Sequence, residues 1–480
     1  MYWWLVPLAL SVANAQEICL SVQDYPYLLF GTKTAYIFSK TDQKANPIAH
    51  ELPGCQPTAF WMLDRQGTHN PESDEINSLQ KLVELKNTIL NNYKNENFKN
   101  TKQRICNSDL NFLQQWIWPE RINPQYAGDL TTDGYMSAQQ HARVWKTKYP
   151  GLFTMNPNNY LFKFVDDLRS KNTFKAFTEG IFGDQAETLS IPKENDEKLL
   201  MPYKSCPIWT KEVEQNNDTL LQRTIFESKK DFQDMIRNVS LRLGFNYELQ
   251  KDDIIRMYNM CRYNKAWNIG QISPWCAAFT REDLKRLEYA EDLETYYKYG
   301  HGTDMNKNIG CTLVKDMLEF FEKHLDDENT PQQPKASIHF SSAAMLLLTL
   351  TALGSHRNLV PLTGDNYYSP QVQARTWATS TMAPYEASLT AVLYKCTQNG
   401  NFQVNEPNQI LFLENERPMM NLEGCKVGLC SWSYIKQRYQ DMAIKCDLQL
   451  CNGSTKLNGI AGISLVAVAF VIKNFMFGSI

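Results

Sequence analysis

The sequence predicts an α/β protein in which a parallel sheet, flanked by helices, carries an inserted and mainly helical segment. The first observation is a short, almost continuous apolar run at 57–63 that ends at Asp64, which is typical of a strand buried on both faces of a parallel sheet. The second is the segment 188–323, where long charged amphipathic stretches such as 220–243 and 281–299 contain no convincing strand. We therefore expect a sheet domain with a helical cap over its ligand-binding edge.

The composition limits the class of protein. The chain has 480 residues, of which 43% are hydrophobic, so it is long enough for a large core and one or two domains. This excludes fibrous and wholly disordered proteins. The formal net charge of −3 argues against nucleic-acid binding by bulk electrostatics, so an anionic ligand would need a local basic pocket. We place the sheet domain at 16–187 and 324–452, and the helical cap at 188–323.

Further apolar patterns predict the other elements of the sheet domain. Apolar residues recur at helical spacing over 78–93, which predicts a helix packed on the sheet. Apolar runs at 337–340 and 389–394 predict strands. The run 343–353 predicts a buried helix that leads to Gly354.

The N-terminal residues 1–15 are typical of a secretory leader. An apolar stretch is followed by Ala13-Asn14-Ala15, a small-x-small cleavage pattern. No Lys or Arg precedes the apolar stretch, so an ordinary buried segment is the alternative. A leader would direct the protein into the secretory pathway, to be secreted or held on the extracellular face of the plasma membrane.

The C-terminal residues 453–480 favour a membrane attachment. Small residues, a polar spacer and an apolar end fit a signal that is exchanged for a glycolipid anchor. A spanning helix is the alternative, but Lys473 leaves only the 13 residues from Ile460 to Ile472 uninterrupted. A bilayer needs about 20.

The cysteines predict an oxidising compartment. All 12 lie between Cys19 and Cys451, and an even number in a secreted chain predicts up to six disulfides. No spacing is that of a zinc site, and we expect no metal. The sequons that begin at Asn217 and Asn238 are candidate glycosylation sites.

One loop carries the candidate chemistry. Asp64-Arg-Gln-Gly-Thr-His-Asn-Pro71 follows the predicted strand, and ligands of open α/β sheets bind beyond the carboxyl ends of strands. Taken alone, the loop is a Gly/Asn/Pro turn. It resembles, however, the Arg-His-Gly-x-Arg-x-Pro signature that branch two of the histidine phosphatases carries after its first strand.

The resemblance covers nearly the whole chain and is strongest to the multiple inositol polyphosphate phosphatases. Stretches that support it are Phe30-Gly-Thr-Lys-Thr-Ala-Tyr36, Gly128-Asp-Leu-Thr-Thr-Asp-Gly134, Leu287-Glu-Tyr-Ala-Glu-Asp-Leu293 and Gly424-Cys-Lys-Val-Gly-Leu-Cys430. The resemblance implies a histidine-phosphatase-like sheet domain with a helical cap. It also implies that phosphate or inositol polyphosphates are the ligands.

The family's chemistry is phosphoric monoester hydrolysis, for which no cofactor is expected. A histidine attacks phosphorus and becomes phosphohistidine, arginines neutralise the non-bridging oxygens, and a Glu or Asp protonates the leaving alcohol. Arginine suits phosphate because its planar fork grips two oxygens at once.

The first signature is only partly present. Arg65 matches its first arginine, but Gln66 stands at the position of the nucleophilic histidine. An amide nitrogen has its lone pair delocalised into the carbonyl, so Gln66 cannot accept the phosphoryl group. His69 stands at the position of the second arginine, where it would be at best a part-time, single-donor cation near neutral pH. A further family arginine, on the strand leading into the next helix, matches Arg169.

The second signature, His-Ala-Glu before a leucine-rich helix, is lost. Counted back from Gly354, Ser342 falls on the phosphate-binding histidine and Ala344 on the proton-donating glutamate. A shift of three residues would place His339 on the histidine, but Ser341 would then replace the acid. Neither alignment supplies a carboxylate.

We therefore expect a pseudophosphatase that binds phosphate or inositol phosphate weakly through Arg65, Arg169, His69 and Ser342. Loss of a nucleophile alone commonly costs on the order of 10³ to 10⁶ in rate. Two alternatives stay open: an active acid or inositol polyphosphate phosphatase with an atypical site, and a cell-surface interaction scaffold.

Overall fold

The computed structural model describes most of the chain. The described residues are 19–21, 26–40, 52–94, 104–326, 333–397, 406–446 and 448–452. The predicted leader at 1–15 and the C-terminal segment 453–480 therefore lie outside them. Among the helices that are described, none combines the length and the apolar character needed to span a bilayer.

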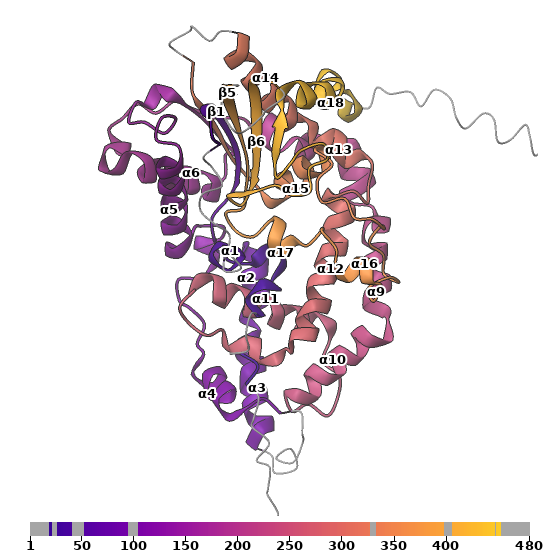
Figure 1. The fold of residues 1–480 in the computed structure, drawn as a ribbon. Coiled ribbons are helices and arrows are strands. Elements are labelled where there is room, and N and C mark those ends of the chain that lie inside the picture. Colours follow the sequence, from indigo (N-terminus) through magenta and orange to yellow (C-terminus); the bar gives the residue numbers. More distant parts are fainter. Residues whose placement is uncertain are drawn as a thin grey trace, which may run out of the picture.

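An eight-stranded sheet forms the centre of the upper part of the molecule (Figure 1). Its strands are β1 (Cys55–Arg65), β2 (Tyr160–Phe164), β3 (Lys193–Asn195), β4 (Ala336–Ser341), β5 (Ser388–Cys396), β6 (Asn408–Glu414), β7 (Arg417–Pro418) and β8 (Leu429–Ser431). They run in the order β3-β2-β4-β1-β5-β6-β7, and β8 pairs with β6. The α/β class and the predicted strands are confirmed. The sheet is mixed rather than parallel, because β5 runs antiparallel to β1.

The central strand β1 separates two hydrophobic cores. Phe60 and Met62 point into one core, and Trp61 and Leu63 into the other. All four are fully buried, which is why the sequence shows a continuous apolar run instead of an alternation.

Helices cover both faces of the sheet, as Figure 1 shows. Those outside the predicted insertion are α1 (Tyr36–Lys40), α2 (Ser73–Gln80), α3 (Leu82–Lys94), α4 (Asn107–Gln115), α5 (Thr132–Lys148), α6 (Leu168–Phe182), α15 (Ala343–Ala352), α16 (Pro370–Gln373), α17 (Thr379–Met382) and α18 (Trp432–Lys445). Helices α5 and α6 pack on the core of Phe60, and α15 packs on the core of Trp61. The predicted buried helix before Gly354 is therefore confirmed as α15, which begins after the N-cap Ser342.

The insertion is mainly helical, as expected. It holds α7 (Glu197–Leu200), α8 (Pro207–Trp209), α9 (Leu221–Ser228), α10 (Lys230–Arg242), α11 (Lys251–Trp267), α12 (Arg281–Tyr299), α13 (Met305–Ile309) and α14 (Cys311–Asp326). It also contributes the short strand β3, which the sequence did not indicate because its three residues are exposed and polar.

The helix predicted at 78–93 differs from expectation. It is divided at Lys81 into α2 and α3, and it packs with the inserted helices instead of the sheet. Tyr93 donates to the carbonyl of Arg242 on α10, and Arg256 on α11 donates to the Ser78 hydroxyl. The lower half of the molecule is thus built from both parts of the sequence (Figure 1).

The twelve cysteines form six disulfides, which is the number that the sequence predicts as a maximum. The pairs are Cys19–Cys106, Cys55–Cys396, Cys206–Cys451, Cys261–Cys276, Cys311–Cys446 and Cys425–Cys430. No cysteine is free. The last pair closes a small loop, with a sequence separation of 5.

Candidate functional site

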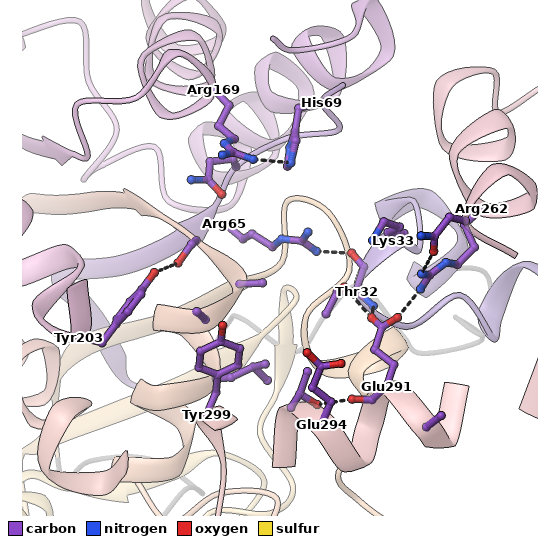
Figure 2. Close-up of a pocket in the computed structure, with 18 of the residues that line it drawn as sticks. Thr32, Lys33, Arg65, His69, Arg169, Tyr203, Arg262, Glu291, Glu294 and Tyr299 are labelled. Carbon is purple, nitrogen blue, oxygen red and sulfur yellow. Dashed lines mark hydrogen bonds and ion pairs between the residues drawn. The ribbon is translucent and has the colours of Figure 1, made fainter. Parts of the chain in front are cut away.

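One cavity of about 540 Å³ lies where β1 and β4 end, between the sheet and the helices of the cap (Figure 2). It brings together the six residues that the sequence analysis assigned to the site: Arg65, Gln66, His69, Arg169, Ser342 and Ala344. The strand-end loop and the start of α15 meet there because β1 and β4 are parallel neighbours, with Arg65 paired to Ser341. The residues predicted for the site therefore lie around one cavity.

Main-chain hydrogen bonds hold the loop after β1 in place. The amide of Gln66 donates to the Ser341 carbonyl at 3.1 Å, and that of Thr131 donates to the Thr68 carbonyl at 2.9 Å. At Gly134, at the start of α5, a Cβ would lie 2.1 Å from the Thr68 oxygen, so only glycine fits there. This contact explains the glycine that ends the 128–134 stretch.

The Gln66 side chain lines the cavity, and its amide already makes a hydrogen bond within the protein. Its Nε2 donates to the Ser170 hydroxyl at 3.0 Å. The side chain is thus held at the start of α6, at the position where the family pattern has a histidine. It offers an acceptor oxygen and N–H donors, but no nucleophilic nitrogen.

Arg65 is fixed as a buried cation. Its Nη1 donates to the Thr32 carbonyl at 2.5 Å and to the Ala383 carbonyl at 2.6 Å. Its guanidinium carbon lies 4.6 Å from the centre of the Tyr385 ring. Burial lowers the pKa of Arg65 to about 10, so it stays charged at neutral pH. A preformed cation of this kind suits an anionic ligand.

Arg169 and His69 contact each other. Arg169 lies in the first turn of α6, not on the preceding strand as the resemblance suggested. Its Nη1 is 3.0 Å from His69 Nε2, and its Nη2 donates to Glu72. Burial, followed by the charges of Arg169 and Arg65, holds the pKa of His69 well below its usual value. These surroundings favour a neutral His69, whereas the sequence analysis expected a part-time cation.

The second signature is aligned on Ser342. Ser342 caps α15 by accepting from the Met345 amide at 3.3 Å, and its hydroxyl lies 2.9 Å from the Tyr203 hydroxyl. His339 is instead fully buried on β4, with Nε2 at 3.0 Å from Asp316, and it does not line the cavity. The cavity therefore favours the alignment on Ser342.

Asp64 and His356, two titratable residues near the signature stretches, lie outside the cavity lining. Asp64 is fully buried, with its carboxylate 3.6 Å from His141. His356 bonds the Glu414 carboxylate at 2.8 Å. Neither belongs to the described residues that line the cavity.

Sequence reasoning missed most of the basic side chains. The cavity is also lined by Lys33, Lys204, Arg223 and Arg262, so that six Lys or Arg stand against three acids, Asp167, Glu291 and Glu294. Lys33 lies in the quoted 30–36 stretch, which was a usable signal. The others lie on the insertion, where charges at helical spacing look like an ordinary solvated surface.

A chain of contacts joins the cap to Arg65, as Figure 2 shows. Arg262 on α11 donates to Glu291 on α12, and Glu291 accepts from the Thr32 amide at 2.7 Å. Thr32 in turn accepts from Arg65. Although burial opposes its charge, Arg262, Lys33 and Thr32 lower the pKa of Glu291 to about 2. Glu291 is therefore ionised near neutral pH and cannot act as a proton donor.

The fold and the cavity define a capped α/β protein with an arginine-lined site suited to a multiply charged anion. Comparison with known sequences gives the family: the chain belongs to the histidine phosphatase superfamily (branch 2), whose model matches residues 77–405. The match begins after the 65–71 loop, where this chain departs from the signature.

Relatives agree over nearly the whole chain. The multiple inositol polyphosphate phosphatase 1 of Drosophila melanogaster is 34% identical over 456 residues, with 93% of each chain covered. The Homo sapiens protein of that name is 25% identical over 446 residues, covering 88% of this chain and 87% of the relative. The crystal structure of a phytase from D. castellii superposes with a TM-score of 0.67 at 18% identity, covering 94% of this chain and 92% of that one.

Proposed function

We propose that this protein is a multiple inositol polyphosphate phosphatase-like protein that binds phosphate or inositol polyphosphates in the cavity and is catalytically impaired. The observation that carries the proposal is Gln66, whose amide occupies the nucleophile position and bonds Ser170. Ala344 lines the same cavity at the acid position, and the ionised Glu291 does not replace it.

Binding is supported independently of catalysis. The excess of basic over acidic side chains around the cavity favours a polyanion. A multiple inositol polyphosphate phosphatase of Bifidobacterium longum has been solved with inositol hexasulfate and with phosphate, at TM-scores of 0.54 and 0.52 to this chain. We therefore expect inositol hexakisphosphate to bind and raise the melting temperature by mass action.

The test is an assay of released phosphate with purified protein and inositol hexakisphosphate, alongside calorimetry. We expect binding without turnover. We expect Arg65→Ala to weaken binding by tenfold or more, on the order of the 1.5–3 kcal/mol of a charge-assisted hydrogen bond. Arg143→Ala, an exposed arginine outside the cavity lining, should leave binding unchanged. Turnover that Arg65→Ala abolishes would refute the impairment.

An active phosphomonoesterase with an atypical site is the alternative, favoured by the similarity over 93% of the chain. Labelled substrate separates the two possibilities, because the phosphohistidine route leaves an acid-labile phosphoenzyme. If neither phosphate nor inositol phosphate stabilises the fold, a surface interaction scaffold becomes the better explanation.

We also propose that the protein passes through the secretory pathway and is anchored at the cell surface. Six disulfides suit an oxidising compartment, and both sequon asparagines, Asn217 and Asn238, are exposed. A glycosidase should reduce the apparent mass of the protein from cells. A phosphatidylinositol-specific lipase should release it from membranes if the attachment is a glycolipid, but not if it is a spanning helix.

A further inference from the structure

The hydrogen bonds of His69 fix its tautomer. Its Nδ1 lies 2.8 Å from the carbonyl oxygen of Gly67, and a carbonyl can only accept. Its Nε2 lies 3.0 Å from Nη1 of Arg169, and a guanidinium can only donate. His69 is therefore neutral, with the proton on Nδ1 and the lone pair of Nε2 directed at Arg169.

Positive groups converge on this ring. Arg169 comes from α6, Arg65 from β1 and Lys33 from the turn Gly31–Lys33, and all three charges lower the pKa of His69. The Tyr385 ring meets it edge to face at 5.1 Å. Two acids, Glu72 and Asp167, contact Arg169: Glu72 is hydrogen-bonded to Nη2, and Asp167 lies 4.0 Å from Nε.

We propose that His69 is a positioning residue whose proton state is set by the ligand. Without a bound polyanion the neutral ring holds Arg169, and when a polyanion binds, Nε2 takes one proton from solvent. This inference rests on the proposed binding of a polyanion in this cavity. It concerns a residue that stands where the family pattern has a permanently charged arginine.

The charge balance explains the coupling. With the cavity empty, a further cation beside Arg169, Arg65 and Lys33 is repelled. A bound ligand with several negative charges, at a distance from His69 similar to that of these cations, reverses the sign of the electrostatic potential at the ring. The proton then binds the lone pair of Nε2, and the hydrogen bond from Arg169 Nη1 is lost. His69 and Arg169 can both donate to the ligand after this step.

The empty state is tested by the ring-nitrogen NMR spectrum of the protein, with His69→Asn used for assignment. We expect the tautomer protonated on Nδ1, without titration between about pH 6 and 8, the range in which an ordinary histidine titrates. A ring protonated on Nε2, or a titration midpoint near the ordinary value, would overturn the first half of the proposal.

The bound state is tested by titration calorimetry with inositol hexasulfate in buffers of different ionisation enthalpy. Sulfate esters keep the same charge over this pH range, so any proton taken up goes to the protein. We expect uptake of up to one proton per ligand, and an affinity that rises by up to about tenfold for each unit that the pH is lowered.

Two variants separate this inference from general pH effects. His69→Asn keeps an acceptor for Arg169 but does not titrate, so its binding should lose the proton uptake and the pH slope. His301→Asn removes another histidine of lowered pKa, which bonds the Ser355 carbonyl outside the cavity lining, and should behave as the wild type does. If His69→Asn binds inositol hexasulfate with the same proton uptake as the wild type, the inference is overturned and the proposed function is not. If the wild type does not bind inositol hexasulfate at any pH, the proposed function is overturned as well.

Discussion

At the scale of single residues, Gln66 is held firmly in place, but its amide is not a nucleophile. Its main chain is bonded to Ser341 and Glu386, and its side chain to Ser170. Under the proposed function, Gln66 stands at the position of the family's nucleophile and lacks its imidazole. A change of side chain should therefore be enough to test whether the geometry still supports chemistry.

We predict that Gln66→His together with His69→Arg, Ser342→His and Ala344→Glu restores phosphate release from inositol hexakisphosphate. Activity should appear only when nucleophile and acid are both present, because residues that act as a unit do not contribute independently. The same variant without Ala344→Glu is the control. An inactive quadruple variant that still folds and binds ligand would show that the cavity has changed more than its signature loops.

Residues differ in how far the sequence could assign them. Arg65 and Gln66 could be placed because they follow a strand of unmistakable pattern. The role of His69 could not, because it depends on a contact with Arg169, 100 residues away in the chain. Arg262 gave no signal either, since nothing in a charged helix shows that its side chain faces a sheet domain.

At the scale of elements, α12 organises the cavity with a series of acids. Glu291 holds Thr32 and Arg262, whereas Asp292 accepts from Arg375 at 2.8 Å and from the Thr379 amide at 2.9 Å. Thr379 begins α17, which leads directly to the Ala383 carbonyl that binds Arg65. One cap helix therefore positions both main-chain segments that fix the buried arginine.

Glu288 is a buried carboxyl on α12 that lies beside Arg375. Burial and the charge of Asp292 raise the pKa of Glu288 to about 8. A group whose pKa is raised in the folded state adds stability below its unfolded pKa and loses it as the pH rises through the folded one. We predict that Glu288→Gln, which cannot ionise, reduces the loss of stability of the wild type between about pH 5 and 9.

The measurement is the melting temperature at several pH values in that range. Glu319→Gln changes an exposed glutamate of α14 and serves as the control, whose curve should run parallel to that of the wild type. A Glu288→Gln curve that also runs parallel would show that the buried carboxyl does not govern the pH response.

The local sequence pattern predicts where an element lies, but it does not predict which neighbours the element packs against. The strand β1 was placed because burial on both faces leaves a run of apolar residues. The segment of α2 and α3 has the amphipathic pattern of a helix, but the pattern does not say which neighbour it packs against. Its packing with α10 and α11 depends on long-range contacts that no local period encodes.

At the scale of the whole molecule, disulfides connect distant parts of the chain. Cys55–Cys396 joins the start of β1 to the end of β5 over a sequence separation of 341, whereas Cys425–Cys430 spans 5. Cross-links that close longer loops remove more entropy from the unfolded chain. We predict that replacing Cys55 and Cys396 by serine lowers the free energy of unfolding by about 2–5 kcal/mol.

The check is chemical denaturation under non-reducing conditions. Replacement of Cys425 and Cys430 by serine is the matched control and should cost less. An equal or larger loss for the short loop would show that loop closure does not determine these contributions.

Gly134, at the start of α5, packs closely against the main chain of the loop after β1. Gly134 and Thr131 contact the main chain of Thr68 and lie outside the cavity lining, so this part of the support for the 66–71 loop does not involve the side chains that face the cavity. Substitutions at the positions that face the cavity can therefore change its chemistry while these main-chain contacts are kept. The same contacts would remain if later substitutions restored the original side chains.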